Sequence, residues 1–498
     1  MMRVMLVIPN SEWYAPGTFW HLHPYPLALL AAMLDRNDHV IHILDANADA
    51  LTPGQFEAAV RDWQPDVVGV SVLANEFAVT GHVACSCVKN VSKTIVTVLG
   101  GVYPTSRPAD AIKDSHVDFV AIGEGEYLFP QLLDHLAGKA PLPDKGLAYL
   151  KDGRAVVQER APFIQDLDAI PYPAYDLIDF NRYATKVYKY IVDAPRALPY
   201  AKLVTSRGCP IGCTFCQVET ISGKMTRYQS PARVVDEMEW LVGTYGVKAF
   251  EFLDDNFLGH RGRALAIFNE MIRRQLPVVW NAMNVSAFYL SEEMLEVMRA
   301  SGCRYVSIAV ESGVQRVLKE IIRKPIDLAH VKRLIAKAKS LGMDTSTLWV
   351  IGSPGETWDE IRTTLTVAEE IDAHYVKINL ATPYPGTKLF DMAVSGGYLP
   401  EDFSFDDIAW GQASFQTEEF SKAELTVLRA FEWDRINFSN ADRCREIARM
   451  MGIGEDRLAE IRRSTRENAL KILPGLGSKQ TVNQPPTCVG DLSISTNT

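Results

Sequence analysis

The apolar positions of residues 1 to about 140 fall into short runs that alternate with helical patterns. The runs are β-branched and almost wholly apolar, as expected of strands that are buried on both faces of a sheet. They lie at residues 4–8, 40–44, 67–72, 94–99 and 119–122. Helical patterns fill the intervals at residues 27–34, 55–63, 79–91 and 109–114. This alternation predicts an α/β domain with a doubly wound, Rossmann-like parallel sheet, which binds ligands beyond the carboxyl ends of its strands.

A second alternation of strand and helix patterns begins near residue 200. We expect its strands at residues 202–206, 249–253, 278–281, 305–310, 344–351 and 375–381. Six such units predict a partial, TIM-like (β/α)6 barrel, whose functional groups lie at the carboxyl ends of the strands. Residues 422–440 and 442–451 have helical periodicity, which predicts a small helical C-terminal domain that closes the barrel mouth or simply caps the fold.

These patterns divide the chain of 498 residues, which is too long for one ordinary domain. The predicted parts are a first domain at residues 1–140, a proline-punctuated linker at 141–198, the barrel at 199–395, the helical domain at 396–475 and a tail at 476–498. The linker contains a hairpin pattern around Asp152-Gly153. The tail is rich in Gln, Thr, Asn, Pro and Ser, a composition typical of disorder.

Composition and charge narrow the classes of protein. Hydrophobic residues make up 47% and charged residues 22% of the chain, which is ordinary for a soluble globular protein. The formal net charge of −10 argues against a protein that coats nucleic acid. There is no run of about 18 apolar residues, so we expect no membrane span. The eight cysteines lack the spacing of a disulfide framework, which favours a reducing, cytoplasmic location.

Three of the cysteines are close together and suggest a metal centre. Cys209, Cys213 and Cys216 have C-x3-C-x2-C spacing and follow the apolar run 201–205. Clustered thiolates suit iron–sulfur clusters and zinc. Structural zinc sites usually have four ligands, and the nearest downstream histidine is His260. An odd trio therefore favours a cubane cluster with one iron left open for a substrate or cofactor.

With an aromatic residue, Phe215, before the last cysteine, the motif resembles that of the radical S-adenosylmethionine (SAM) superfamily. The resemblance implies that Cys209, Cys213 and Cys216 hold a 4Fe–4S cluster whose open iron binds SAM. One electron, from an external donor of the flavodoxin or ferredoxin type, then cleaves SAM to a 5′-deoxyadenosyl radical. Phe215 would lie near the adenine.

Turns that follow the predicted barrel strands resemble turns of the same family. The resemblance implies that Asp254 or Asp255 binds the SAM amino group, and that Glu311, in Glu-Ser-Gly, lies near the ribose and methionine portion. Gly352 opens a Gly-x-Pro-Gly-Glu-Thr turn expected beside the adenine. Arg227 is a candidate fork-shaped donor to the SAM carboxylate. A structural role remains the alternative for each of these residues.

The first domain resembles the cobalamin-binding domains that precede radical SAM barrels. Ser71 and Leu73, followed by Gly100 and Gly101, match the second half of the cobalamin signature, and Glu124 lies in a Gly-Glu-Gly-Glu turn of that family. The first half, Asp-x-His-x-x-Gly after the first strand, is missing. Cobalamin is therefore expected without a histidine below the cobalt. Asp114-Ser115-His116 is a chance match, and the aromatic loop 10–26 offers His21 and His23 as exceptions. A bare Rossmann-like domain is the alternative.

The resemblance implies a cobalamin-dependent radical SAM methyltransferase that acts on a small-molecule biosynthetic intermediate. The radical would abstract hydrogen, and methylcobalamin would deliver the methyl group to an unactivated carbon or to phosphorus. Two alternatives stay open: an oxidative cyclase or ring-rearranging enzyme with the same cofactors, and a protein that carries cobalamin without turnover. The sequence assigns no catalytic side chain and names no substrate.

Overall fold

The computed structural model describes residues 1–14, 23–185, 192–324, 326–401, 403–405, 408–409 and 411–473. The chain divides into two compact units. The first contains Met1–Pro162 and Pro173–Ile178, and the second contains Phe163–Tyr172 and Asp179–Ile472. Within the described part of the chain, no helix has both the length and the apolar character needed to cross a membrane.

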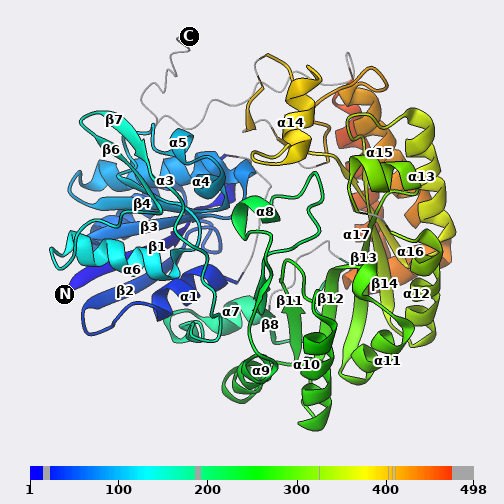
Figure 1. The fold of residues 1–498 in the computed structure, drawn as a ribbon, viewed down its shortest axis with the longest axis horizontal. Coiled ribbons are helices and arrows are strands. Elements are labelled where there is room, and N and C mark those ends of the chain that lie inside the picture. The colour runs from blue at the N-terminus through cyan, green and yellow to red at the C-terminus, as the bar shows by residue number, and fades with distance from the viewer. Residues whose placement is uncertain are drawn as a thin grey trace. The chain divides into compact units, whose positions relative to one another are not determined.

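The first unit is built on a seven-stranded sheet in the order β2-β1-β3-β4-β5-β6-β7 (Figure 1). The strands are β1 (Met2–Ile8), β2 (His39–Asp45), β3 (Val67–Val72), β4 (Val96–Gly101), β5 (Phe119–Ala121), β6 (Leu147–Lys151) and β7 (Arg154–Val157). The first five are parallel, which confirms the predicted doubly wound sheet. The β6–β7 hairpin, expected in a linker, instead pairs antiparallel with β5 and extends the sheet.

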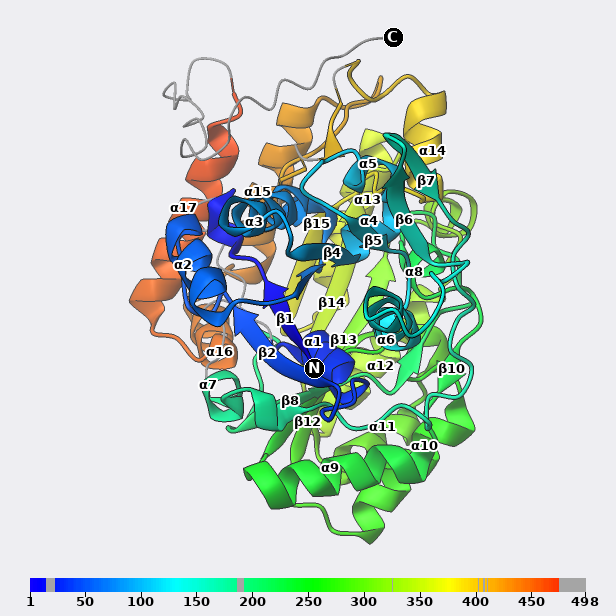
Figure 2. The same cartoon turned by 90° about the vertical axis from the view of Figure 1, so that its left-hand side faces the viewer.

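Helices cover both faces of this sheet. They are α1 (Tyr25–Ala32), α2 (Pro53–Trp63), α3 (Ala78–Val91), α4 (Val102–Ser106), α5 (Pro108–Ala111) and α6 (Gly125–Leu136). Helices α2 and α3 contact each other, as do α1 and α6 (Figure 2). Side chains alternate along a strand, so Met5 and Val7 of β1 pack in the core beneath α2 and α3, whereas Leu6 lies near Phe129 of α6.

The second unit contains six parallel strands in sequential spatial order (Figure 1). The strands are β8 (Tyr200–Leu203), β11 (Ala249–Phe252), β12 (Val279–Ser286), β13 (Cys303–Glu311), β14 (Asp344–Ile351) and β15 (Tyr375–Leu380). The intervening helices include α9 (Pro231–Tyr245), α10 (Arg261–Arg273), α11 (Glu292–Ala300), α12 (Leu328–Ser340), α13 (Trp358–Glu370) and α14 (Lys388–Ser395). This arrangement confirms the predicted barrel class, and all six strand ends lie at one edge.

Three further helices complete the second unit: α15 (Lys422–Asn437), α16 (Ala441–Met451) and α17 (Glu455–Leu470). Helix α15 covers the free edge of β15, where Asn437 accepts a hydrogen bond from the Val376 N–H and donates one to the Val376 carbonyl. An unpaired strand edge would otherwise expose such groups to other chains. Helix α17 was not predicted, since only Leu458 and Ala469 of its side chains are buried and its sequence lacks an apolar stripe.

A buried polar layer closes the barrel near the beginning of its strands. The Lys377 Nζ lies 2.5 Å from Asp193 Oδ2, and the Tyr305 hydroxyl is hydrogen-bonded to both Asp193 and Ser346. Asn281, paired in register with Tyr305, donates to the Asp193 backbone carbonyl at 2.8 Å. These contacts close the end of the barrel where the strands begin. The carboxyl ends of the strands are left for ligands.

Candidate cofactor sites at the two sheet edges

A short antiparallel ribbon fixes the two ends of the cysteine loop. It pairs β9 (Ser206–Arg207) with β10 (Arg227–Tyr228). Between them, the Gly208 N–H donates to Asp255 Oδ2 at 2.7 Å, and the Cys209 N–H donates to the Gly223 carbonyl at 3.1 Å. Gly208 has φ +91°, and a Cβ there would lie 2.4 Å from the Met225 carbonyl oxygen. Glycine is therefore required where the loop leaves β9.

The middle of the loop is held by the segment that follows β13. Thr214 donates its N–H to the Ile322 carbonyl and its hydroxyl to the Ile321 carbonyl, at 3.1 and 2.9 Å. Phe215 packs against the apolar cluster that contains Ile321, Ile322 and Val317. These contacts give Phe215 a packing role, and its predicted contact with adenine stays a prediction.

The three thiols are half-buried and have the chemistry of cluster ligands. Burial raises the pKa of Cys213 to about 12 and that of Cys216 to about 11, and it also raises the pKa of Cys209. Such sites hold thiolates only when a cationic centre accompanies them, and coordination deprotonates a thiol outright. Three thiols on one short loop are the ligand type that iron–sulfur clusters use, so the residues present fit such a cluster.

The two acids after β11 support the cysteine loop. Asp254 Oδ1 accepts hydrogen bonds from the hydroxyls of Thr205 and Ser206, at 2.7 and 2.6 Å. Burial raises the pKa of Asp254, although these hydrogen bonds act in the opposite direction. Asp255 accepts from the Gly208 N–H, as described above. The structure thus gives both carboxylates protein partners at the loop, and their contact with the SAM amino group stays a prediction.

Polar atoms without partners lie at the carboxyl ends of β11, β12 and β13. Glu311 Oε2, Ser286 Oγ and Asn256 Nδ2 are buried and have no hydrogen-bond partner among the described residues. An unpaired buried polar group costs about 1–3 kcal/mol, so such a set is consistent with a ligand that supplies the partners. The ammonium, carboxylate and hydroxyl groups of SAM match these acceptors and donors, and the residues present therefore fit SAM.

The turn after β14 is closed by a buried carboxyl group. Glu356 Oε2 accepts from the N–H groups of Gly352 and Ser353, at 2.8 and 3.0 Å. Burial raises the pKa of Glu356 to about 7. Gly352 has φ +84°, and a Cβ there would lie 2.2 Å from Leu425 Cδ2. The predicted turn is thus a packed structure, in which Gly352 is required on steric grounds.

Arg227 has partners that the sequence did not indicate. Its guanidinium donates to the backbone carbonyls of Ile164 and Ser222, at 2.7 and 2.9 Å, and lies over the Phe163 ring. Only 6% of Arg227 is exposed. The side chain anchors the connector before the barrel to the end of the cysteine loop, and its predicted contact with the SAM carboxylate stays a prediction.

At the edge of the first unit, the predicted cobalamin residues lie together. Ser71 of β3 pairs in register with Gly100 of β4, and Val72 pairs with Gly101. A Cβ on Gly100 would meet only the Ala121 side chain, at 3.8 Å, so the backbone there stays open to a large ligand. Gly101 has φ +106°, and a Cβ there would lie 2.3 Å from the Val72 carbonyl oxygen.

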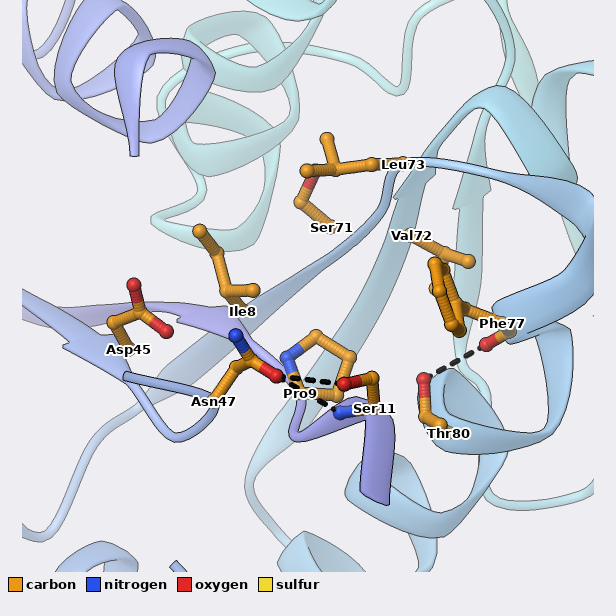
Figure 3. Close-up of a pocket in the computed structure, with 10 residues that line it drawn as sticks. All are labelled: Ile8, Pro9, Ser11, Asp45, Asn47, Ser71, Val72, Leu73, Phe77 and Thr80. Atoms are coloured by element: carbon orange, nitrogen blue, oxygen red, sulfur yellow. Dashed lines mark hydrogen bonds between the residues drawn. The ribbon is translucent and has the colours of Figure 1, made fainter. Parts of the chain in front are cut away.

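A hollow lies at the ends of β1, β2 and β3 (Figure 3). It is lined by Ile8, Pro9, Ser11, Asp45, Asn47, Ser71, Val72, Leu73, Phe77 and Thr80. The Asn47 side-chain oxygen accepts from the Ser11 N–H and hydroxyl, at 3.2 and 2.8 Å. The lining combines apolar side chains with a few polar groups, as cofactor sites do. Sequence reasoning missed Asp45 and Asn47, although polar residues directly after an apolar strand were the available signal.

Among the residues that the structure describes, no histidine lines the hollow. His116 and His82 both bind Asp114, at 2.7 Å each, so the Asp114-Ser115-His116 match has a structural use elsewhere. His23 is buried, and His21 lies outside the described residues. Glu124 lies directly before α6, and the Gly123 N–H donates to Thr105 at 3.0 Å. Cobalamin without a histidine below the cobalt stays a prediction.

Comparisons with known proteins agree with this geometry. Residues 203–368 match the radical SAM superfamily, and residues 21–133 match the B12 binding domain. The chain belongs to the radical SAM enzymes that carry a cobalamin-binding domain. Its cofactors are a 4Fe–4S cluster, SAM and cobalamin.

Among curated proteins, the chain is 31% identical to an uncharacterized methyltransferase of Pyrococcus horikoshii, over 80% of this chain and 84% of that protein. It is 29% identical to cytidylyl-2-hydroxyethylphosphonate methyltransferase of Streptomyces wedmorensis, over 80% and 83%. It is 27% identical to anaerobic magnesium-protoporphyrin IX monomethyl ester cyclase of Rubrivivax gelatinosus, over 85% and 75%. These relatives place the chain in the cobalamin-dependent radical SAM methyltransferase family, which also resembles cyclases.

Solved structures show the same fold. The radical SAM methyltransferase TsrM of Kitasatospora setae, with cobalamin and a 4Fe–4S cluster bound, has a TM-score of 0.64 and 17% identity. The match covers 94% of this chain and all of that one. The fold therefore extends through both units and the C-terminal helices.

Proposed function

We propose that this protein is a methyltransferase that adds a methyl group to an unactivated carbon, or to phosphorus, of a small biosynthetic intermediate. One observation carries the proposal. A single chain has a three-cysteine loop beside unpartnered polar atoms at strand ends, and also a B12-binding sheet edge that is open at Gly100. The two relatives named as methyltransferases support transfer of a methyl group as the outcome.

Some of these residues bind the cofactors, and others orient SAM or hold the cysteine loop in place. When bound, the cluster supplies the electron that cleaves SAM, and cobalamin supplies a carrier for the methyl group. Cys209, Cys213 and Cys216 hold the cluster. Glu311 orients SAM through its free oxygen, and Asp255 keeps the loop in place through Gly208.

At the other edge, Ser71, Leu73, Gly100, Gly101 and Glu124 hold cobalamin. The small or uncharged side chains of Ser71, Leu73, Gly100 and Gly101 leave the backbone accessible at the ends of β3 and β4. The reducing electron comes from an external flavodoxin or ferredoxin, and the enzyme works in the cytoplasm. No side chain of the protein acts as nucleophile or general base in this proposal.

A cyclase or ring-rearranging enzyme is the second candidate, and the identity of 27% to a cyclase favours keeping it. Both candidates use the same cofactor sites. They differ in one measurable respect, because methyl transfer leaves a methyl group of SAM in the product and ring closure does not.

The experiment uses the full chain, reconstituted anaerobically with iron, sulfide and cobalamin, and SAM labelled with deuterium in its methyl group. Candidate substrates include nucleotidyl phosphonates, given the Streptomyces relative. We expect labelled methyl in the product together with 5′-deoxyadenosine, and neither with Cys213→Ala. A product that lacks the label but forms together with 5′-deoxyadenosine would indicate cyclisation instead of methyl transfer. Labelled product without 5′-deoxyadenosine would overturn the hydrogen abstraction.

A further inference from the structure

A buried ion pair lies at the carboxyl end of β13. The Lys324 Nζ is 2.7 Å from Glu311 Oε1 and also donates to the Ala309 carbonyl at 2.9 Å. The side chains of Lys324 and Glu311 are only 5% and 4% exposed. Removing two charges from water costs several kcal/mol per ion, so such a pair is weak evidence for stability. Stability therefore does not explain why the ion pair lies at the carboxyl ends of the strands.

Lys324 leaves one oxygen of Glu311 free and holds the other. Glu311 has φ +77°, a left-handed conformation that is strained for a residue other than glycine. The turn after it is fixed by Thr364, whose hydroxyl is hydrogen-bonded to the Ser312 hydroxyl and the Gly313 N–H, at 3.0 and 3.1 Å. With Oε1 bound to Lys324, Oε2 remains buried and has no hydrogen-bond partner in the part of the chain that the structure describes. Strain and an unsatisfied acceptor at one residue are features of a functional site.

The same ammonium lies on the segment that holds the cysteine loop. Thr214, which follows Cys213, donates its N–H to the Ile322 carbonyl and its hydroxyl to the Ile321 carbonyl, at 3.1 and 2.9 Å. Lys324 lies two residues after Ile322, and its N–H donates to the Leu318 carbonyl at 2.8 Å. Burial lowers the pKa of Lys324, but attraction by Glu311 keeps it above its ordinary value. Lys324 is thus a fixed positive charge on the segment that contacts the cysteine loop.

We propose that Lys324 is a positioning residue with two effects: it raises the reduction potential of the cluster, and it presents Glu311 Oε2 to SAM. Reduction adds one electron from the flavodoxin- or ferredoxin-type donor, and hence one negative charge, to the cluster. A fixed cation in a low-dielectric site stabilises that added charge. The inference rests on the proposed function only in that the cluster must be reduced before SAM is cleaved.

Charge-changing variants give opposite predictions. In the reconstituted full chain, Lys324→Met removes a positive charge, and we expect about a tenfold smaller equilibrium constant for one-electron reduction, which corresponds to about 59 mV. Glu311→Gln removes a negative charge and should shift the potential upward. The double variant restores the net charge and should return close to wild type. The potentials are measured by EPR-monitored redox titration without SAM.

Lys202 offers a matched control. It forms a buried pair with Glu251 at 3.5 Å, and both side chains are 9% exposed. By strand register this pair is level with Asn281 and Tyr305, about 20 Å before Glu311 along β13 at about 3.3 Å per residue. Lys202→Met should therefore destabilise the fold as Lys324→Met does but leave the potential unchanged.

The second effect has its own readout. Equilibrium binding of SAM to the reconstituted protein should weaken at least tenfold in Lys324→Met and in the double variant, but less than twofold in Lys202→Met. Equal potentials in Lys324→Met and Lys202→Met, or shifts of one sign in both Lys324→Met and Glu311→Gln, would overturn the proposal. Neither measurement needs a methyl acceptor, so failure here is distinguishable from failure of the proposed methyl transfer.

Discussion

The two sheets of this protein prepare their ligand edges by different physical means. In the first unit, glycines end β4 and leave backbone uncovered, and the carboxylate of Asp45 already accepts a hydrogen bond from the Ala48 N–H. In the second unit, carboxyl groups follow β11, β13 and β14, and burial raises the pKa of Asp254 and of Glu356. The first edge provides space, and the second provides buried ionisable groups before any ligand arrives.

This difference between the two edges matches the ligand proposed for each: cobalamin at the first edge and SAM at the second. A corrin is large, and a sheet edge without side chains lets its tail approach the backbone. SAM is small and charged, and the atoms proposed to bind it include Glu311 Oε2, which is buried and lacks a hydrogen-bond partner among the described residues. Leaving such an atom unpaired costs the free protein free energy. Substitutions that fill space should therefore damage the first edge most, and substitutions that change charge should damage the second.

The largest effect is expected from Gly101→Ala. Both the left-handed backbone and the contact of 2.3 Å with the Val72 carbonyl oxygen oppose a Cβ. We expect a loss of about 2–4 kcal/mol in the free energy of unfolding of the first unit, and at least tenfold weaker retention of cobalamin. Denaturant unfolding and the absorbance of bound cobalamin measure the two quantities.

Gly138→Ala is the control for Gly101→Ala. Gly138 has φ +71°, but no atom of the described residues lies within 4 Å of an added Cβ. The variant should lose only about 1–2 kcal/mol of the free energy of unfolding, because of the left-handed backbone, and it should keep cobalamin. Equal losses in the two variants would mean that the close approach of β3 and β4 does not shape this edge.

Glu356→Gln tests the charge at the second edge and should have an intermediate effect. The pKa of Glu356 in the folded protein, about 7, lies above the ordinary value of 4.5. Between these pH values the native state holds a proton that the unfolded state has released, so the free energy of unfolding decreases as pH rises through this window. The full difference is up to about 3 kcal/mol. The variant should lose this dependence when denaturant unfolding is compared at pH 5 and pH 8.

Glu237→Gln provides the comparison for Glu356. Burial also raises the pKa of Glu237 to about 7, but this residue lies on α9, away from the strand ends. Each variant should remove its own part of the pH dependence, and only Glu356→Gln should alter SAM binding. A SAM affinity that changes equally in both variants would contradict a local role for the turn after β14.

Both edges were predictable from sequence to the extent that they follow from strand order. Parallel strands place their carboxyl ends at one edge, so the residues after each apolar run could be grouped without a structure. Ser71 beside Gly100, and Glu311 at the end of β13, follow this logic. The cluster loop was predicted from a different signal, the local spacing of the three cysteines.

The remaining contacts depend on packing that no local pattern encodes. Lys324 reaches Glu311 only because the segment after β13 folds back over the strand end. Asp255 binds the Gly208 N–H because β9 and β10 bring the loop close. The β6–β7 hairpin was recognised, but its pairing with β5 was not, since an edge strand can add to a sheet without any sequence signal.

Arg227 gives the smallest expected effect and the sharpest test of an assignment from sequence. Its guanidinium donates to the carbonyls of Ile164 and Ser222, and lysine can keep only part of this fork. Arg227→Lys should lower the free energy of unfolding by about 1–2 kcal/mol and change the SAM dissociation constant less than twofold. Arg233→Lys is the matched control, because Arg233 donates to the Ile170 carbonyl at 2.8 Å and stacks on Tyr172 of the same connector. Tenfold weaker SAM binding in Arg227→Lys alone, with stability unchanged, would instead support the predicted contact of Arg227 with the SAM carboxylate.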